Sequence, residues 1–462
     1  MQPEQASVQN GTEPTGTIKR RSFLKTLGAA AGLATVMGPD ALHGIEAAVR
    51  NSAGLTPREA ARDEALWSEV QQAFTMSRSL INLDNAWTCP SPRVVTEALV
   101  QYIWHQEKVP AQQWVNDFED RVDTVRVALA RLYGVNAGEI AVVRNTTEAL
   151  KTVLYGVELK AGDEVLTTRL DYSSMISALR HRQQRDGITL TRIDVPVPPQ
   201  SPDELVEAFA RAITRKTRLI LTSHIAYLNG QVFPVGRICD LAHQHGIEVV
   251  VDGAHSFAHL ADTQQDIRAD YYGTSLHKWM LAPKGTGMLF IPEDKIEKIQ
   301  PLMSGPSRRR NASMGKFESV GTQSLAPFLA IGEAIIFHNA IGPKRKEERL
   351  RYLTHYWVER LQTIPKIRLY TSLDSEMSCG IATIGIEGIH PVPLGDYLWE
   401  QHHIQTAPIE RGETIQGLRI SPNLYTTLHE LDYFCEVMEH VTFTGLPEPY
   451  ASYKPRSWRF DG

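Results

Sequence analysis

The sequence is poor in cysteine and has little charge imbalance, and both facts argue against whole classes of protein. Its 462 residues include four cysteines, which lie far apart without CxxC or CxxxC spacing: Cys89, Cys239, Cys379 and Cys435. A zinc ribbon, an iron–sulfur cluster or a disulfide framework does not fit this pattern. The 48 basic and 53 acidic residues give a formal net charge of −5. No overall charge therefore draws the mature chain to nucleic acid or to an anionic membrane.

Long hydrophobic runs, internal repeats and low-complexity tracts are also missing. No stretch reaches the roughly 20 apolar residues that a membrane-spanning helix needs. The hydrophobic share of 42% is nevertheless enough to bury a large core, so the chain is not disordered. At roughly 150 residues per domain the length allows about three units, and two are expected if one is a large α/β domain.

The N-terminus has the pattern of an export signal. Residues 19–25 read KRRSFLK, and a short stretch rich in alanine and glycine follows up to Met37. Paired arginines before such a stretch are typical of twin-arginine signals. We therefore assign residues 1–45 to a signal and linker, place cleavage between Ala41 and Ala53, and expect a periplasmic or secreted protein that uses the twin-arginine machinery. The alternative is an amphipathic helix or a solvated basic patch.

Residues 125–291 alternate between helix-like segments, such as 147–155 and 202–213, and short apolar segments. This alternation predicts βαβ units and a mostly parallel sheet, since strands covered on both faces are nearly all apolar. The predicted strands are residues 139–143, 164–168, 218–222, 247–251, 271–274 and 286–291.

The pattern of apolar and polar residues changes after a passage rich in proline, arginine and glycine at residues 301–315. Apolar side chains then recur at helical spacing at Leu350, Leu353, Trp357 and Leu361, which predicts an amphipathic helix. Shorter strands are expected at residues 380–386 and 418–421. We predict a large domain over residues 96–324 and a smaller α+β domain over 325–462.

The segment that carries chemistry is VVVDGAH at residues 249–255, followed by SLHKW at 275–279. Ligands gather where the strands of a doubly wound sheet end. Asp252 ends one strand, and burial there is costly without a cation nearby. Lys278 ends the next strand-and-turn unit, so both side chains converge on one crevice. A buried carboxylate beside a lysine of depressed pKa favours Schiff-base chemistry, with the carboxylate on a pyridinium nitrogen.

These segments contain the motifs Asp-x-x-His at 252–255 and Ser-x-His-Lys at 275–278, and Pro-x-Gly-x-Gly follows at 283–287. In their order and spacing they resemble the class V aminotransferases, a group of pyridoxal-phosphate (PLP) enzymes that includes cysteine desulfurases, isopenicillin N epimerases and kynureninases. The resemblance covers about residues 80–440. It implies fold type I of the PLP-dependent transferases, an α/β fold with a helix-flanked, mostly parallel sheet and a smaller C-terminal α+β domain.

The resemblance also implies roles for the residues of these motifs. Lys278 would hold the cofactor covalently and act as acid and base at the substrate α-carbon. Asp252 would keep the pyridine nitrogen protonated, and His255 would lie near the ring hydroxyl.

A phosphate site is expected where residues 144–150 read RNTTEAL, just after a strand and at the start of a helix. Backbone N–H groups of Thr146 and Thr147 would bind the dianion; the alternative is an ordinary threonine cap. By resemblance, Ser275 and His277 are further phosphate ligands. Thr322, after Gly321, would reach the cofactor of a partner subunit, so a homodimer is expected.

Four residues are expected to shape the substrate site. Tyr172 would stack on the cofactor ring, although a core tyrosine is the alternative. Arg419 would bind the substrate α-carboxylate with its planar fork, the alternative being an exposed ion pair. Asn85 lies in the segment over residues 46–95, which by resemblance lines the active-site mouth. Tyr227 replaces an asparagine that desulfurases place near the cofactor and the substrate carboxylate.

The departures from the family pattern favour one branch. Glu410 stands where one desulfurase branch has its reactive cysteine, so persulfide chemistry is disfavoured. The sequence looks most like isopenicillin N epimerase-like proteins, which predicts exchange of the α-proton on either face, with Tyr172 as the second acid. A C–S β-lyase or desulfurase-like eliminase, an aminotransferase and a non-catalytic binding protein are the alternatives. No metal site is expected, because the paired histidines lack a third ligand at sensible spacing.

Overall fold

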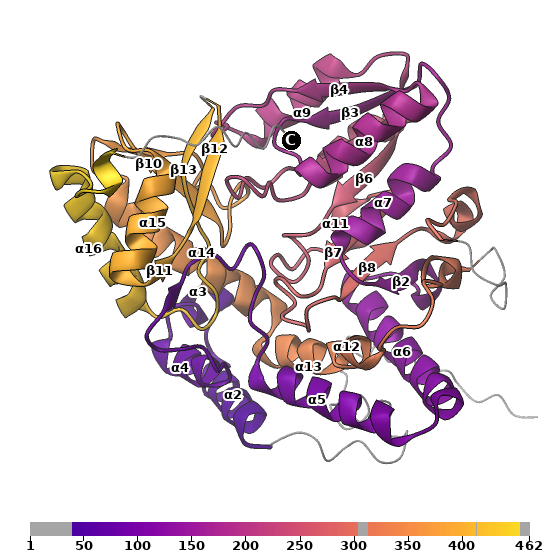
Figure 1. The fold of residues 1–462 in the computed structure, drawn as a ribbon, viewed down its shortest axis with the longest axis horizontal. Helices are drawn as coiled ribbons and strands as arrows, with labels where there is room; N and C mark the ends of the chain where they lie inside the picture. Colours follow the sequence, from indigo (N-terminus) through magenta and orange to yellow (C-terminus); the bar gives the residue numbers. More distant parts are fainter. Residues whose placement is uncertain (1–38, 304–312, 413, 453–462) are drawn as a thin grey trace, which may run out of the picture. The chain divides into compact units, whose positions relative to one another are not determined.

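A seven-stranded mixed sheet forms the centre of the fold (Figure 1). Its strands hydrogen-bond in the order β2 (Ile140–Val143), β8 (Gly287–Phe290), β7 (Tyr271–Ser275), β6 (Glu248–Asp252), β5 (Thr217–Ser223), β3 (Glu164–Thr168) and β4 (Thr189–Ile193). β8 runs antiparallel to both neighbours, and every other pair is parallel. The predicted α/β fold with a mostly parallel sheet is confirmed.

The structure is a computed structural model that describes residues 39–303, 313–412 and 414–452, without the side chains of residues 39–42 and 114–119. The paired arginines of the predicted export signal lie outside the described residues. The region between Ala41 and Ala53, where signal cleavage was expected, overlaps the helix α2 (Pro39–Asn51), whose Ile45 is fully buried. In the part of the chain that the structure describes, no helix combines the length and apolar composition that crossing a membrane requires.

Helices cover both faces of the sheet because strand residues alternate between two cores. Val249 and Val251 point to one core, with α6 (Ala111–Tyr133), α9 (Pro202–Ala212) and α10 (Val235–Gln244). Val250 points to the other, with α7 (Thr146–Gly156) and α8 (Ser173–Asp186). Each fully buried valine contributes roughly 1.5–3 kcal/mol, so the apolar strand holds both helix layers.

Six strands of the large sheet lie where the sequence predicts them, and β3 has the predicted bounds. β4 was not predicted. Its residues are Thr-Leu-Thr-Arg-Ile, and it is an edge strand with half-exposed side chains, so it lacks the continuous apolar run of the inner strands.

A second, antiparallel sheet lies in the C-terminal part of the chain. Its order is β12 (Ala407–Arg411), β13 (Ile415–Ile420), β10 (Ala382–Ile386) and β9 (Ile367–Leu369). The predicted amphipathic helix is α14 (Pro343–Leu361), and its four spaced apolar side chains are all buried. α14 packs against α16 (Leu428–Thr444), and α15 (Pro391–His402) packs against β12.

The N-terminal part of the described chain joins this C-terminal region. β1 (Ile81–Asn82) pairs in parallel with β11 (Ile404–Gln405), and Asp84 forms a bridge with Ser421 just after β13. α2 packs against α4 (Glu64–Gln72) and α13 (Ile331–Ile341). Among the described residues, the remaining α-helices are α3 (Pro57–Ala60), α5 (Arg93–Lys108), α11 (Gln264–Ile267) and α12 (Ala326–Leu329).

The predicted domain boundary near residue 325 falls just before α12 and α13, which pack against α5 and α6. The helices after this boundary are thus shared between the two predicted domains. The boundaries at residues 45, 95 and 324 remain predictions.

Candidate active site

Polar side chains meet at the carboxyl ends of the central strands. β5 ends at Ser223, β6 at Asp252 and β7 at Ser275, and Lys278 follows three residues after β7. β5, β6 and β7 are neighbouring parallel strands, so these ends share one edge of the sheet. The predicted residues therefore lie at one edge of the sheet, the kind of edge at which ligands of doubly wound sheets gather.

Asp252 is a carboxylate that the protein buries almost completely. Its side chain accepts a hydrogen bond from the backbone N–H of Ala254 at 2.9 Å, and the residue is 5% exposed. The next residue must be Gly253, because a Cβ there would lie 2.0 Å from the ring of Tyr272. Burial raises the pKa of Asp252 to about 6, whereas the charge of Lys278 lowers it. The carboxylate is thus short of a cationic partner.

The pKa of Lys278 is shifted in the opposite direction. Its Nζ lies 3.1 Å from Nε2 of His255. Burial lowers the pKa of Lys278 to about 8, while the negative charge of Asp252 raises it. An amine with this pKa is partly uncharged near neutral pH, which a nucleophile or a base requires.

His255 is held in one tautomer by a residue that the sequence reasoning did not assign. The indole Nε1–H of Trp279 donates to Nδ1 of His255 at 3.4 Å. Burial and the charge of Lys278 hold the pKa of His255 well below its usual value, so the ring is neutral. Because an indole N–H can only donate, the imidazole hydrogen resides on Nε2 and faces the lysine amine.

Trp279 is itself fixed by its surroundings. Its ring stacks on His259 with centroids 3.8 Å apart, and its carbonyl oxygen accepts a hydrogen bond from the buried amine of Lys346. Trp279 was visible in the quoted motif SLHKW, but nothing in the sequence indicates which histidine its N–H contacts.

The predicted phosphate site lies at the N-terminus of α7. Both the backbone N–H and the hydroxyl of Thr146 contact Oγ of Ser275, at 2.9 and 2.6 Å. The helix approaches β7 closely because Gly273 has no side chain; a Cβ there would lie 2.7 Å from Leu150. Asn145 caps the helix by accepting from Glu148 N–H, which leaves half-buried Thr147 in the first turn as predicted.

His277 and Thr322, the other predicted phosphate ligands, lie in different surroundings. His277 contacts the carbonyl of Thr286 through Nδ1 at 3.1 Å, and burial lowers its pKa to about 4, so it is neutral. Thr322 is exposed. It follows a segment that is anchored to the edge strand β2, where Glu318 accepts from the backbone N–H of Val142 at 2.8 Å.

Arg419 is buried in β13 at 4% exposure, in line with the expectation that it is not a solvated arginine. Its Nη2 donates to Asp84 and its Nη1 to the carbonyl of Tyr227, both at 2.7 Å. Its buried Nε has no hydrogen-bond partner. Asp84 was missed as the partner of Arg419, because 335 residues separate the two and no local pattern links them.

The two predicted active-site tyrosines touch each other. The rings of Tyr172 and Tyr227 make an edge contact with centroids 5.2 Å apart. Tyr172 precedes α8 and is 42% exposed, which differs from the alternative of a core tyrosine. The preceding Asp171 fixes this turn, since its oxygens accept five hydrogen bonds from Thr167, Thr168 and Ser223.

Asn85, a predicted substrate-binding residue, uses its side chain within the protein. Its Nδ2 donates to the carbonyls of Asn82 and Ser421, and its Oδ1 accepts from the hydroxyl of Tyr425 at 2.6 Å. The residue is fully buried. Asn85 thus ties the N-terminal segment to the end of β13, and its predicted role toward a substrate remains a prediction.

The residues at this edge fit pyridoxal phosphate. A protonated pyridine nitrogen would supply the cation that buried Asp252 is short of. Lys278 offers an amine of depressed pKa, and the α7 N-terminus offers backbone N–H groups and a positive dipole for phosphate. When bound, PLP withdraws electrons from the substrate α-carbon.

All four cysteines are buried, with exposed fractions of 0% or 1%. Burial raises the pKa of Cys89, Cys379 and Cys435 to about 12, and it raises the pKa of Cys239 as well. These thiols lack the exposure and thiolate character of reactive cysteines. Among the described residues, no three side chains of histidine, cysteine, aspartate or glutamate gather as a metal site would require.

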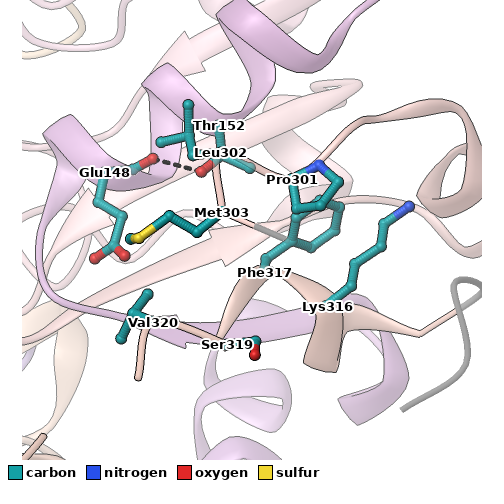
Figure 2. A pocket seen from close by; sticks show the side chains of 9 residues that line it. All are labelled: Glu148, Thr152, Pro301, Leu302, Met303, Lys316, Phe317, Ser319 and Val320. Atoms are coloured by element: carbon teal, nitrogen blue, oxygen red, sulfur yellow. Dashed lines mark hydrogen bonds between the residues drawn. The ribbon is translucent and has the colours of Figure 1, made fainter. Parts of the chain in front are cut away.

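A small surface pocket lies outside the predicted site (Figure 2). Figure 2 shows Glu148 and Thr152 of α7 on one side and Phe317 on the other, with the Thr152 hydroxyl bonded to the Glu148 carbonyl at 2.8 Å. None of the predicted cofactor or substrate residues lines this pocket.

Comparison with known proteins supports the resemblance. The family model described as "Aminotransferase class-V" matches residues 81–434. An isopenicillin N epimerase of Streptomyces clavuligerus is 29% identical over 81% of this chain and 98% of its own length. A probable cysteine desulfurase of Synechocystis is 29% identical over 81% of this chain and 95% of its own.

Solved structures agree on the fold. The cystine C–S lyase C-DES in complex with cysteine persulfide superposes with a TM-score of 0.70 at 21% identity, covering 78% of this chain and 97% of that one. Because the family match spans most of the sequence and the site residues suit the cofactor, the chain belongs to the class V aminotransferase family and is a PLP-dependent enzyme.

Proposed function

We propose that the protein is an isopenicillin N epimerase-like enzyme that exchanges the α-hydrogen of an amino acid and returns it to either face. One observation carries this choice: all four thiols are buried and have raised pKa values, so a persulfide-forming nucleophile is not at hand. Proton transfer at the α-carbon needs only an amine such as that of Lys278, whose pKa of about 8 suits a base near neutral pH.

The surrounding residues have complementary proposed tasks. Lys278 removes and returns the α-proton on one face. Asp252 holds the protonated ring nitrogen of the cofactor. Arg419 binds the α-carboxylate, since its Nε is buried without a partner and a carboxylate would satisfy it.

Tyr172 is the proposed acid on the opposite face. Its ring is partly exposed and lies against Tyr227, whose carbonyl contacts Arg419, so it borders the place where the carboxylate would bind. For Tyr172→Phe we expect continued α-hydrogen exchange through Lys278 but loss of inversion. Equal loss of exchange and inversion would contradict this division of roles.

The test of the proposed function is the fate of the α-hydrogen in D2O. The holoenzyme is incubated with a panel of L- and D-amino acids, α-deuterium is followed by NMR, and configuration by chiral chromatography. We expect deuterium incorporation with inversion for at least one amino acid. Retention of the α-hydrogen in every amino acid would overturn the proposal.

A C–S β-lyase is the second candidate, because desulfurases are also among the relatives. Because the cysteines are buried, the sulfur would then leave bound to the substrate fragment or to a small thiol, and not to a cysteine of the enzyme. The same incubation identifies this reaction by release of ammonia and pyruvate. Transamination would instead yield a keto acid and the amine form of the cofactor.

We further propose a homodimer in which Thr322 reaches the cofactor of the partner subunit. Its exposure and its anchored position after Glu318 support this role. In a mixture of inactive Lys278→Ala and phosphate-impaired Thr322→Val, heterodimers would regain one intact site if the role is correct. Absence of any regained activity after mixing and reassembly would contradict it.

Export by the twin-arginine route remains our proposal for residues 1–45. The motif KRRSFLK at residues 19–25 supports it. Replacing Arg20 and Arg21 by lysine should retain the protein in the cytoplasm, which cell fractionation measures. Unchanged distribution would contradict the proposal.

A further inference from the structure

Four arginines gather beside the predicted substrate site: Arg169, Arg180, Arg192 and Arg411, here called the arginine group. Arg192 lies in β4 opposite Thr167 of β3, and Arg411 ends β12. The Nη2 of Arg411 contacts the carbonyl of Arg169 at 3.4 Å, which joins the hairpin β12–β13 to the end of β3. The group therefore connects the two sheets.

The hairpin directs Arg411 and Arg419 to the same side. Arg419 pairs with Ala407 across β12–β13, so the two side chains share one face of the hairpin. Every second side chain of a strand lies on the same face, so residues 409 and 411 share the face of Ala407. The hydroxyl of Tyr227 lies within electrostatic reach of Arg411, Arg419 and Arg192, whose charges lower its pKa against the larger, raising effect of burial. The arginine group is thus a continuation of the predicted α-carboxylate site.

At the centre of the arginine group, Arg192 has donor atoms that no acceptor reaches. The Nε and Nη2 atoms of Arg192 are buried without a hydrogen-bond partner. Asp171, the nearby carboxylate, is occupied by its five hydrogen bonds to Thr167, Thr168 and Ser223. Within residues 39–303, 313–412 and 414–452, Arg169 is the member with an ion pair, to exposed Asp194 at 2.9 Å.

A guanidinium with unpaired donors beside other arginines, as at Arg192, is unfavourable for folding alone. Burial lowers the pKa of Arg192, and the charges of Arg411, Arg180 and Arg169 lower it further. Buried donors without acceptors and like charges side by side both cost free energy. A cluster of this kind is typical of a site that an anion completes.

We propose that the arginine group binds a second carboxylate of the substrate, at the end of its side chain. Resting on the proposed function, this inference names the substrate class: amino acids whose side chain ends in a carboxylate. Arg419 then holds the α-carboxylate, and Arg192 with Arg411 holds the distal one. The planar guanidinium fork matches a carboxylate with two parallel hydrogen bonds.

The hairpin also limits the length of the substrate. Arg419 pairs with Ala407, and Arg411 lies four residues further along β12. At about 3.3 Å per residue, the Cα atoms of the two arginines are therefore offset by roughly 13 Å along the hairpin. Both side chains lie on the same face of the hairpin. Chains with several methylenes between the two carboxylates should therefore bind better than aspartate.

The binding test does not depend on turnover. Isothermal titration calorimetry of the holoenzyme compares adipate with hexanoate and pimelate with heptanoate, pairs that differ by one carboxylate. We expect the dicarboxylate to bind about 10-fold more tightly or better, since a hydrogen bond to a charged group has this value. Equal affinity within each pair would overturn the inference.

Variants assign the effect to the arginine group. Arg192→Gln and Arg411→Gln should each weaken dicarboxylate binding about 10-fold while leaving monocarboxylate binding within about 2-fold. Arg211→Gln, whose arginine pairs with Glu207 on the surface of α9, is the matched control and should change neither. Equal weakening of both ligands in Arg192→Gln would contradict a distal site.

Failure of this inference and failure of the proposed function are distinguishable. If α-hydrogen exchange fails but the dicarboxylate preference is found, the substrate class stands and the reaction is a different one. If exchange occurs with uncharged amino acids such as norleucine as fast as with α-aminoadipate, the inference is wrong and the function stands. Arg192→Lys, which keeps the charge, provides a second variant if Arg192→Gln does not fold.

Discussion

The floor of the predicted site and the arginine group at its side solve opposite problems. On the floor, Asp252 and His255 are buried and Lys278 is half-buried, and each has a neighbour within hydrogen-bond or electrostatic reach. In the arginine group, donors of Arg192 are left unpaired and like charges lie together. The comparison teaches that reactivity is prepared by the fold itself, whereas recognition is left for the substrate to complete.

Removing the amine of Lys278 from the floor should have the largest effect on the reaction. Lys278→Ala should lower α-hydrogen exchange by on the order of 1,000-fold, because acid–base catalysis at the α-carbon is lost. It should also abolish the covalent attachment of the cofactor, measured by mass spectrometry after borohydride reduction. Lys298→Ala, which removes an exposed lysine outside the predicted site, is the control. Full exchange in Lys278→Ala would refute the role of this residue.

Removing the carboxylate from the floor should have the next largest effect. Asp252→Asn should lower exchange on the order of 100-fold, since the cation that Asp252 would hold loses its buried partner. The negative charge of Asp252 raises the pKa of Lys278, so its loss should move that pKa below its value of about 8.

The measurement is the rate at which apoprotein takes up PLP between about pH 6 and pH 10. Only the uncharged amine reacts, so the wild-type rate should rise up to about pH 8 and then level off. With a lysine of unperturbed pKa, the rate of PLP uptake would continue to rise up to about pH 10.4. A midpoint in Asp252→Asn at or above the wild-type midpoint would contradict the electrostatic account.

These two residues could be predicted from sequence because strand, acid, turn and lysine follow one another within a short stretch. The central strands were predictable for the same reason, as Ile247 to Val251 are nearly all apolar. The partners of Asp84 and Asn85 could not be predicted, because Arg419 and Ser421 lie far away in the sequence and are brought close by the pairing of β1 with β11 and the bridge that follows it. β4 and Arg192 were missed together, since an edge strand with half-exposed side chains has no distinctive pattern.

Trp279→Phe tests whether the floor is oriented as well as buried, with a smaller expected effect. Without the indole N–H, His255 can place its hydrogen on Nδ1, and Nε2 then accepts from the charged form of Lys278. The pKa of Lys278 should therefore rise, opposite in sign to Asp252→Asn, and exchange should fall about 10-fold. The pH profile of PLP uptake measures this, with Trp399→Phe as control, because the side chain of Trp399 in α15 is exposed. An unchanged midpoint would show that the indole only fills space.

The smallest expected effect concerns the arginine group and the free energy of unfolding. Arg192→Gln should raise the free energy of unfolding of the ligand-free protein by about 0.5 kcal/mol, because one charge leaves a group of like charges. Arg211→Gln should lower it slightly, since it breaks an exposed ion pair. Urea unfolding at constant cofactor measures both. A loss of stability in Arg192→Gln would mean that Arg192 supports the fold and not a ligand.

The contact between Asp84 and Arg419 also bears on the timing of synthesis. Arg419 comes 335 positions after Asp84, so the ribosome needs roughly 17–67 s to deliver it after Asp84 has emerged, at about 5–20 residues per second. During this interval Asp84 and Asn85 have none of their partners from β13 and the residues that follow it. The active site is therefore a late product of translation, and ribosome-bound chains that end before β13 should contain the central sheet without a finished substrate site.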